Sequence, residues 1–207
     1  MKNIVLSNLT IKFKRIALLI KMKIIYYFVI AYVILVISIV FFLAWSILKG
    51  APWSPTNKEK VFKILSLANV QPGELVYDLG CGDGRVLIIA AKYFGARAIG
   101  IEIDPIRFIW CKFLILFLGL RKKVQVFYGD FFNKDFSDAD VVICYLLQNT
   151  NDKLQSKLIT ELRPQVRVVS NRFVFSGLPL INMDKEMRVY SYNIGVQSID
   201  TEINKSL

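Results

Sequence analysis

Glycines and acids occupy the end of an expected apolar strand at residues 75–79 and the loop that follows it. The segment Asp78-Leu-Gly-Cys-Gly-Asp-Gly-Arg85 has glycines at positions 80, 82 and 84. Three glycines in five positions let the backbone turn sharply and approach a ligand at the start of the next helix. The spacing differs from the G-x-G-x-x-G of dinucleotide-binding loops, and the acid at Asp78 would repel a pyrophosphate. An acid at this position favours a cationic ligand.

Two further acids follow the next two expected strands. Glu102 ends the strand at residues 98–102, where a carboxylate can accept both hydroxyls of a ribose. Asp130 follows the strand at residues 124–128 and could accept the exocyclic amine of adenine, with Phe131 covering the ring; a surface turn explains Asp130 equally well on its own. A cation, a ribose and an adenine together make up S-adenosylmethionine, which is therefore the expected cofactor.

The order of these segments predicts an α/β fold. Further strands are expected at residues 141–145, 166–170 and 188–194, with helices at 85–94, 105–118 and 151–162. Another helix should start at Thr56, since Thr56 and Glu59 have capping-box spacing. The alternation predicts a doubly wound, mostly parallel Rossmann-like sheet covered on both faces, with ligands at the carboxyl ends of its strands. Tyr93 is expected to point inward from the helix at residues 85–94, and Asp104 to cap the helix that Pro105 begins.

The N-terminal region predicts one transmembrane helix before this domain. Residues 24–48 contain no charge, and a 25-residue helix exceeds the thickness of the bilayer hydrocarbon. The stretch is too long for a cleaved signal peptide and lacks its cleavage site. Residues 1–23 carry six basic side chains and no acid, so they either lie on anionic lipid or act only as a topology signal. The expected organisation is a basic segment at 1–23, the span at 24–48, a linker at 49–56 and the α/β domain at 57–207.

Composition narrows the chemistry. The net charge of the chain is +11. Without the first 23 residues, 21 basic side chains remain against 16 acidic ones, and so small an excess is weak support for nucleic-acid binding. The absence of histidine excludes histidine-based triads and histidine general bases. Three cysteines at distant positions show no metal-ligand spacing, so no metal is expected, and reduced thiols in the cytosol fit best.

These motifs resemble those of class I S-adenosylmethionine methyltransferases. A narrower likeness, to a small family of archaeal and membrane-anchored mitochondrial protein-lysine methyltransferases, covers nearly all of the domain. It is carried by the following segments: Pro52-Trp53-Ser54-Pro55-Thr56, Asp140 to Leu147, Asn151, Lys157-Leu158, Val168-Val169-Ser170 and Arg172-Phe173. Leu178 and Gln165 depart from the family, which tends to have tryptophan and glycine there, and both are expected on the acceptor side of the site.

The resemblance implies protein lysine as the methyl acceptor, possibly on a membrane protein. The cofactor-binding residues it implies are Asp78, Gly80, Gly82, Glu102, Asp130 and Phe131, with the loop of Thr56 folding over the methionine end. Tyr145 is the candidate for lining the methyl-transfer site, although an aromatic plug at the end of the sheet is the alternative. Asn171 and Phe173 either shape the acceptor groove or end a strand.

Two other functions are weighed against this one. Nucleic-acid amino-methyltransferases usually carry an Asp/Asn-Pro-Pro-aromatic run after the fourth strand, where this chain has Cys144-Tyr145-Leu146-Leu147, so nucleic acid is not the expected partner. A small-molecule acceptor or a non-catalytic scaffold that binds the cofactor is the other alternative. The six basic residues before the span favour a cytosolic N-terminus and hence a domain outside the cytosol. Four lysines follow the span, so the charge difference between its two sides is small: Lys49, Lys58, Lys60 and Lys63. Cofactor supply places the domain on the cytosolic face.

Overall fold

The computed structural model describes residues 2–48 and 56–195, with side chains in the first segment for Arg15 and residues 18–41. The chain forms two compact units, Met1–Lys49 and Gly50–Leu207. The segment Pro52–Pro55 and the rest of the expected linker up to Thr56 lie outside the described residues.

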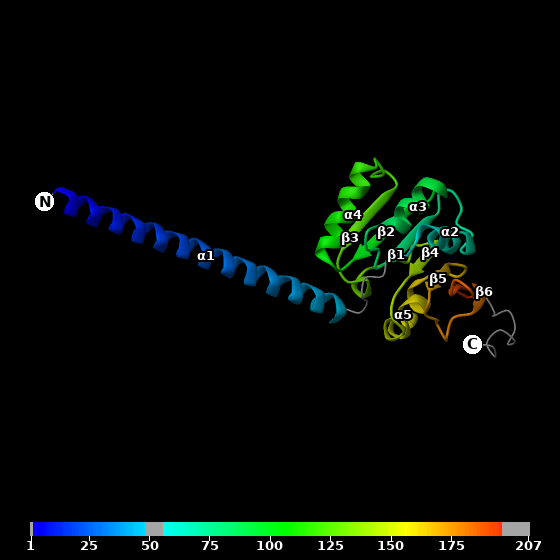
Figure 1. Cartoon of the computed structure of the whole chain (residues 1–207). Coiled ribbons are helices and arrows are strands. Elements are labelled where there is room, and N and C mark those ends of the chain that lie inside the picture. Colours follow the sequence, from blue (N-terminus) through cyan, green and yellow to red (C-terminus); the bar gives the residue numbers. More distant parts are fainter. Residues whose placement is uncertain (1, 49–55, 196–207) are drawn as a thin grey trace. The chain divides into compact units, whose positions relative to one another are not determined.

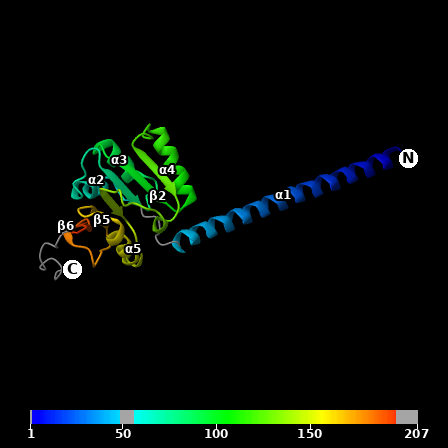
Figure 2. The same ribbon diagram turned by 180° about the vertical axis from the view of Figure 1, so that it is seen from behind.

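The first unit is one helix, α1 (Lys2–Leu48), blue in Figures 1 and 2. Within it, Leu18–Phe41 is long and apolar enough to cross a membrane, and none of it is buried. This stretch begins six residues before the expected span. At 1.5 Å per residue the 47-residue helix is about 70 Å long, more than twice the hydrocarbon thickness. The basic N-terminal segment therefore continues the same helix.

The second unit contains a seven-stranded sheet in the order β3-β2-β1-β4-β5-β7-β6. The first five strands in this order are parallel, whereas β7 runs antiparallel to both β5 and β6. The doubly wound, mostly parallel sheet expected from the sequence is confirmed. The strands are β1 (Leu75–Leu79), β2 (Arg97–Glu102), β3 (Val124–Tyr128), β4 (Val141–Cys144), β5 (Arg167–Asn171), β6 (Leu180–Asp184) and β7 (Val189–Asn193).

Helices cover both faces of the sheet (Figures 1 and 2). One face packs against three helices, through a core that includes Ile64, Leu87 and Cys111. The other packs against one helix and the segments that follow β3 and β5, through Leu154, Phe136 and other residues. The first three helices are α2 (Lys58–Leu67), α3 (Arg85–Tyr93) and α4 (Pro105–Phe117); the fourth is α5 (Gln148–Glu161). All three cysteines are buried free thiols.

Local capping decides where α2 starts, and the expected capping box at Thr56 is wrong. Asn57 is the N-cap, because its side chain accepts a hydrogen bond of 2.8 Å from the backbone N–H of Lys60. Asparagine caps helices at least as well as threonine. Thr56 is thereby left outside the helix, with its side chain available for other contacts.

Three other expectations need correction. Tyr93 does not point inward: 67% of it is exposed, and it lies edge-on to Phe62. The helix α5 starts at Gln148, three residues before the expected start. The strand β6 was not expected, because Leu180–Asp184 lacks an apolar run; it forms because β7 offers it an antiparallel partner.

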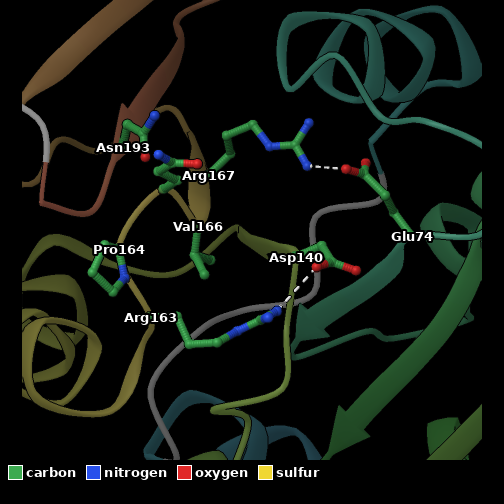
Figure 3. Close-up of a pocket in the computed structure, with 8 residues that line it drawn as sticks. Glu74, Asp140, Arg163, Pro164, Val166, Arg167 and Asn193 are labelled. Atoms are coloured by element: carbon green, nitrogen blue, oxygen red, sulfur yellow. Dashed lines mark hydrogen bonds and ion pairs between the residues drawn. The ribbon is translucent and has the colours of Figure 1, made fainter.

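A polar cleft of about 540 Å³ lies at the amino ends of β1, β4 and β5. Figure 3 shows its two ion pairs, Arg167 with Glu74 and Arg163 with Asp140. Gln165 lines this cleft, so its expected place on the acceptor side is wrong. The reason is its position before a strand of a parallel sheet, at the edge opposite the ligand-binding one. Leu178 is buried in the core.

The backbone conformation at Gln165 is one that favours glycine. Its φ is +72°, in the left-handed region, and its side chain is exposed. We expect Gln165→Gly to raise the free energy of unfolding by about 0.5–1 kcal/mol, because relief of strain exceeds the added flexibility of the unfolded chain. Urea unfolding of the full chain in detergent measures this. Gln165→Ala keeps the strain and should show no gain; an equal effect of both variants would contradict the explanation.

Candidate active site

The parallel strands bring the candidate residues to one edge of the sheet. Leu79 pairs with Ile101 and with Cys144, and Cys144 pairs with Ser170. The residues that follow are therefore level with one another at the carboxyl ends of the strands: Gly80, Glu102, Tyr145 and Asn171. Tyr128 of β3 is opposite Glu102, so the Asp130 loop adjoins the same edge.

The glycine loop has the backbone conformation that its sequence suggests. Gly80, Gly82 and Gly84 have φ values of +86°, +58° and +78°. The N–H of Gly80 donates to the carbonyl of Ile101 at 2.9 Å, which holds the loop against β2. Gly100 permits this approach, since a β-carbon there would lie 2.5 Å from the sulfur of Cys81. The loop thus presents backbone N–H groups at the start of α3.

Glu102 connects this loop to the start of α4. It is 4% exposed, and its carboxylate accepts from the N–H of Gly82 at 2.7 Å and from the N–H of Asp104 at 2.9 Å. Each carboxylate oxygen keeps a further lone pair, so both ribose hydroxyls can still be accepted. Asp104 caps α4 as expected, accepting from Ile106 N–H and Arg107 N–H.

Asp78 is the acid whose surroundings best fit a cationic ligand. It is 5% exposed, and no hydrogen bond to its side chain is found within the described residues. Burial, and then the neighbouring charges of Glu102 and Asp83, raise its pKa to about 8. A cation bound beside it would favour the ionised form. The residues therefore fit the ammonium group of S-adenosylmethionine.

Asp130 is interpreted from the sequence either as an acceptor for adenine or as part of a surface turn, and its geometry is compatible with both. Its side chain accepts from the N–H of Phe132 at 2.9 Å and so caps a short 3-10 helix, η1 (Phe131–Asn133). This bond uses one carboxylate oxygen and leaves the other for a ligand. Phe131 is partly buried, with its ring centroid 4.8 Å from that of Phe132. Adenine binding by Asp130 and Phe131 remains a prediction that this geometry permits.

Thr56 is held at the same edge by two contacts. Its carbonyl accepts from the guanidinium of Arg85, at the start of α3, and its hydroxyl accepts from the Asn171 side chain at 3.4 Å. Thr56 thus lies between the glycine loop and the end of β5. This position agrees with the predicted contact to the methionine end of the cofactor.

Tyr145 directly follows β4 and is partly buried. It is close enough to act electrostatically on Lys60, whose pKa burial lowers and Tyr145 raises. Arg172 and Arg188 lower that pKa further. Asp184 raises that pKa, so Lys60, the cation that acts on the predicted methyl-transfer residue Tyr145, lies among two arginines and one acid.

Sequence reasoning missed two features of this side of the site. Lys60 stands in the sequence as one flanking charge among several; its position four residues after Thr56 was the available signal. Asn151 is fully buried, and its amide donates to the hydroxyl of Ser170 at 3.1 Å. Buried side-chain oxygens of Asn151 and Asn171 have no partner among the described residues. In those same parts of the chain, no group of three metal-ligating side chains is found.

The strand order, the glycine loop and the acids at successive strand ends define a class I S-adenosylmethionine-dependent methyltransferase. The family described as "ANTKMT methyltransferase domain" matches residues 78–181, and the chain belongs to it. A protein-lysine N-methyltransferase of Saccharolobus islandicus is 42% identical over 127 residues, which are 61% of this chain and 79% of that protein.

Two further relatives extend the comparison. A lysine N-methyltransferase of Xenopus laevis, named for the C subunit of ATP synthase, is 31% identical over 124 residues, which are 60% of this chain and 54% of that protein. The chain thus spans about half the length of this vertebrate relative. A crystal structure of an RNA methyltransferase from Salinibacter ruber with S-adenosyl-L-homocysteine is 37% identical, with a TM-score of 0.64, and the match covers 72% of this chain and 97% of that one.

Asp78→Asn should separate cofactor binding from stability. Loss of a charge-assisted contact should weaken cofactor affinity by roughly 1.5–3 kcal/mol. The cofactor-free variant should be more stable, because the raised pKa of Asp78 makes the folded protein hold its proton between about pH 4 and pH 8. Stability from this group therefore falls as pH rises through that window, and the variant should gain at least about 1 kcal/mol over wild type at pH 8.

Calorimetry of cofactor binding and urea unfolding at several pH values measure the two effects. Asp135→Asn, the same change on an exposed turn, serves as the control and should leave cofactor affinity unchanged. A variant with unaltered cofactor affinity would exclude Asp78 from the binding site. A stability difference that does not grow between pH 4 and pH 8 would show that its carboxylate is already ionised.

Proposed function

We propose that this chain is a protein-lysine N-methyltransferase attached to a membrane by one span, with its catalytic domain on the cytosolic face. The 42% identity to the archaeal protein-lysine N-methyltransferase carries the choice of acceptor. The matched family segment includes Asp78, Glu102, Asp130 and Tyr145. The names of the vertebrate relatives also specify a lysine acceptor.

The proposed reaction asks this chain mainly to align two reactants and to exclude water. Bound S-adenosylmethionine supplies an electrophilic methyl group whose sulfur departs as a neutral thioether. The lysine ε-amine must first lose a proton, and no histidine is present to take it. The phenol oxygen of Tyr145 can accept a hydrogen bond from the amine and direct its lone pair, while the released proton passes to water. Thr56 and Asn171 border the same space.

RNA is the second candidate acceptor, because the Salinibacter ruber structure is described as an RNA methyltransferase. Lys60, which acts electrostatically on Tyr145, and the nearby Arg172 and Arg188 also suit an anionic substrate, although Asp184 acts on Lys60 in the opposite sense. Against it, the sequence after β4 lacks the Asp/Asn-Pro-Pro-aromatic run that positions a base amine. An acidic surface around the target lysine would satisfy the same three basic residues. These observations favour protein over RNA.

Labelled-methyl transfer from the cofactor distinguishes the acceptors. Native membranes and total RNA are each incubated with the full-length enzyme, and lysine methylation is mapped by mass spectrometry. We expect label on lysine ε-amines, and Tyr145→Phe should lower turnover about 10-fold or more while leaving cofactor affinity unchanged. Tyr93→Phe, on an exposed helix position, is the matched control and should have no effect. Label only in RNA would reject the lysine assignment.

Membrane attachment rests on α1. The exposed, largely apolar stretch Leu18–Phe41 has no acid; its only charges, Lys21 and Lys23, lie near its start, and Arg15 precedes it. Seven residues, 49–55, connect α1 to Thr56, and even fully extended they reach only about 25 Å. Such a tether would keep the active site near the bilayer and favour membrane-associated substrates. The free thiols and the need for cofactor support the cytosolic face.

Removing residues 1–48 tests whether the anchor selects substrates. The truncated enzyme should keep its activity on a soluble lysine peptide, because the site is built entirely from the second unit. It should lose most of its activity on membrane-embedded targets, because the tether no longer raises their local concentration. The ratio of the two activities, compared with the full-length enzyme in vesicles, is the measurement. If the truncated enzyme keeps its activity equally on both substrates, the anchor only localises the enzyme and does not select its substrates.

A further inference from the structure

The helix α4 carries an apolar face that the described parts of the chain leave exposed. Its inner side is buried in the core at Cys111 and Ile115. On the opposite side, large apolar side chains recur every three or four residues, which places them on one surface of the helix. We call them the α4 face: Ile106 59%, Ile109 65%, Trp110 53%, Phe113 52%, Leu116 56% and Phe117 75% exposed.

The aromatic members of the α4 face pack against one another. The ring centroids of Trp110 and Phe113 are 5.8 Å apart, and those of Phe113 and Phe117 are stacked at 6.1 Å. The helix is therefore apolar on both its inner and its outer side. An ordinary surface helix of a soluble domain presents charged and polar residues outward, so the α4 face indicates a partner.

The charges in and just after this helix are basic. From Pro105 to Gly129 the sequence has no acid and five basic residues, of which Arg107 is paired with Asp104, the residue that caps the helix, at 3.6 Å. Lys112 is exposed on the helix itself, with its amine 5.3 Å from the Phe108 ring centroid. Arg121, Lys122 and Lys123 form an exposed turn between the end of α4 and β3. An apolar strip with Trp and Phe, flanked by Lys and Arg, is typical of helices that lie in the surface of an anionic bilayer.

The same charges argue against a second copy of this chain as the occupant. A two-fold interface would place the α4 face against itself and bring its basic residues together. The neighbouring acid Asp104 is buried and already paired with Arg107, so it offers no partner to the basic residues of a second copy. A lipid surface fits both the apolar face and the basic residues, since acyl chains pack against aromatic side chains and phosphate groups pair with basic ones. The chain also carries its own candidate span, so a bilayer would be within reach of the domain.

We propose that the α4 face docks the catalytic domain onto anionic lipid, with Trp110, Phe113 and Phe117 entering the boundary between headgroups and acyl chains. This inference rests on the membrane attachment proposed above and adds a second, peripheral contact. Because Asp104, the N-cap of α4, donates its N–H to Glu102, docking holds the cofactor edge of the sheet at a defined position relative to the lipid. Substrate lysines close to the bilayer surface are then favoured.

Trp110 provides the probe. Full-length chain carrying Trp45→Phe and Trp53→Phe keeps Trp110 as its sole indole and is reconstituted into vesicles of phosphatidylcholine, with or without phosphatidylglycerol. Flotation measures membrane attachment, and spin-labelled acyl chains measure contact of Trp110 with lipid. We expect the chain to float with the vesicles and the labelled lipid to remove about half of the Trp110 emission, more strongly when phosphatidylglycerol is present.

Variants of the α4 face and a matched control complete the test. Phe113→Glu combined with Phe117→Glu should abolish the quenching, whereas Ile159→Glu, at a 51% exposed position of α5, should leave it intact. Unchanged cofactor binding in both variants verifies the fold.

Other outcomes overturn the proposal in distinguishable ways. A chain that floats while Trp110 stays water-exposed and unquenched retains its span but has no docking face. A Trp110 that is shielded but not quenched by lipid has a protein partner, either a second copy or another segment. A chain that does not float refutes membrane attachment and, with it, the docking.

Discussion

The hydrogen bonds of the Glu102 carboxylate organise the functional edge of this protein. One oxygen accepts from Gly82 in the loop after β1, and the other accepts from Asp104 at the start of α4. A single buried side chain thereby sets the distance between the glycine loop and the start of α4. Because hydrogen bonds to a charged acceptor are strong, the loop is prepared for a ligand before the ligand arrives. The ribose-binding role predicted for Glu102 uses the lone pairs that remain.

The cofactor edge concentrates negative charge where solvent is excluded. Asp78 lies near Glu102 with no donor in the described chain, and its raised pKa expresses the resulting free-energy cost. Such an arrangement is unfavourable in the protein alone and becomes favourable when a cation binds between the acids. The opposite edge of the sheet differs in kind. There Arg167 pairs with Glu74 and also donates to the carbonyls of Ala68 and Asn69, which anchors the end of α2 to β5.

The two edges therefore have separate duties in one parallel sheet. Charges at the amino-terminal edge are paired and hold elements together, whereas acids at the carboxyl-terminal edge are left to meet a ligand. Burial on both faces keeps the strands in register, and the register brings Gly80, Glu102 and Tyr145 to the same level. The α4 helix joins this edge to the exposed apolar face, so any surface that binds the helix also orients the site.

Much of this could be predicted from residue types and spacing. The alternation of apolar strands and helices determines a doubly wound sheet, because buried parallel strands require apolar runs and crossover helices. The three acids at strand ends followed from the same logic, since each strand's last residue and its loop are adjacent in the sequence. Aspartate and proline at positions 104 and 105 determined the start of α4 in the same local way.

Only the tertiary structure decided the features that depend on distant segments. The strand β6 exists because β7 lies beside it, and Gln165 faces the amino-terminal cleft because of the direction of β5. The contact of Thr56 with Asn171 joins residues 115 positions apart, which no local pattern specifies. Large apolar residues stand on more than one side of α4, and packing alone decided which of them enter the core and which remain exposed. Burial is a property of three-dimensional neighbours, and a one-dimensional pattern records only the preference for it.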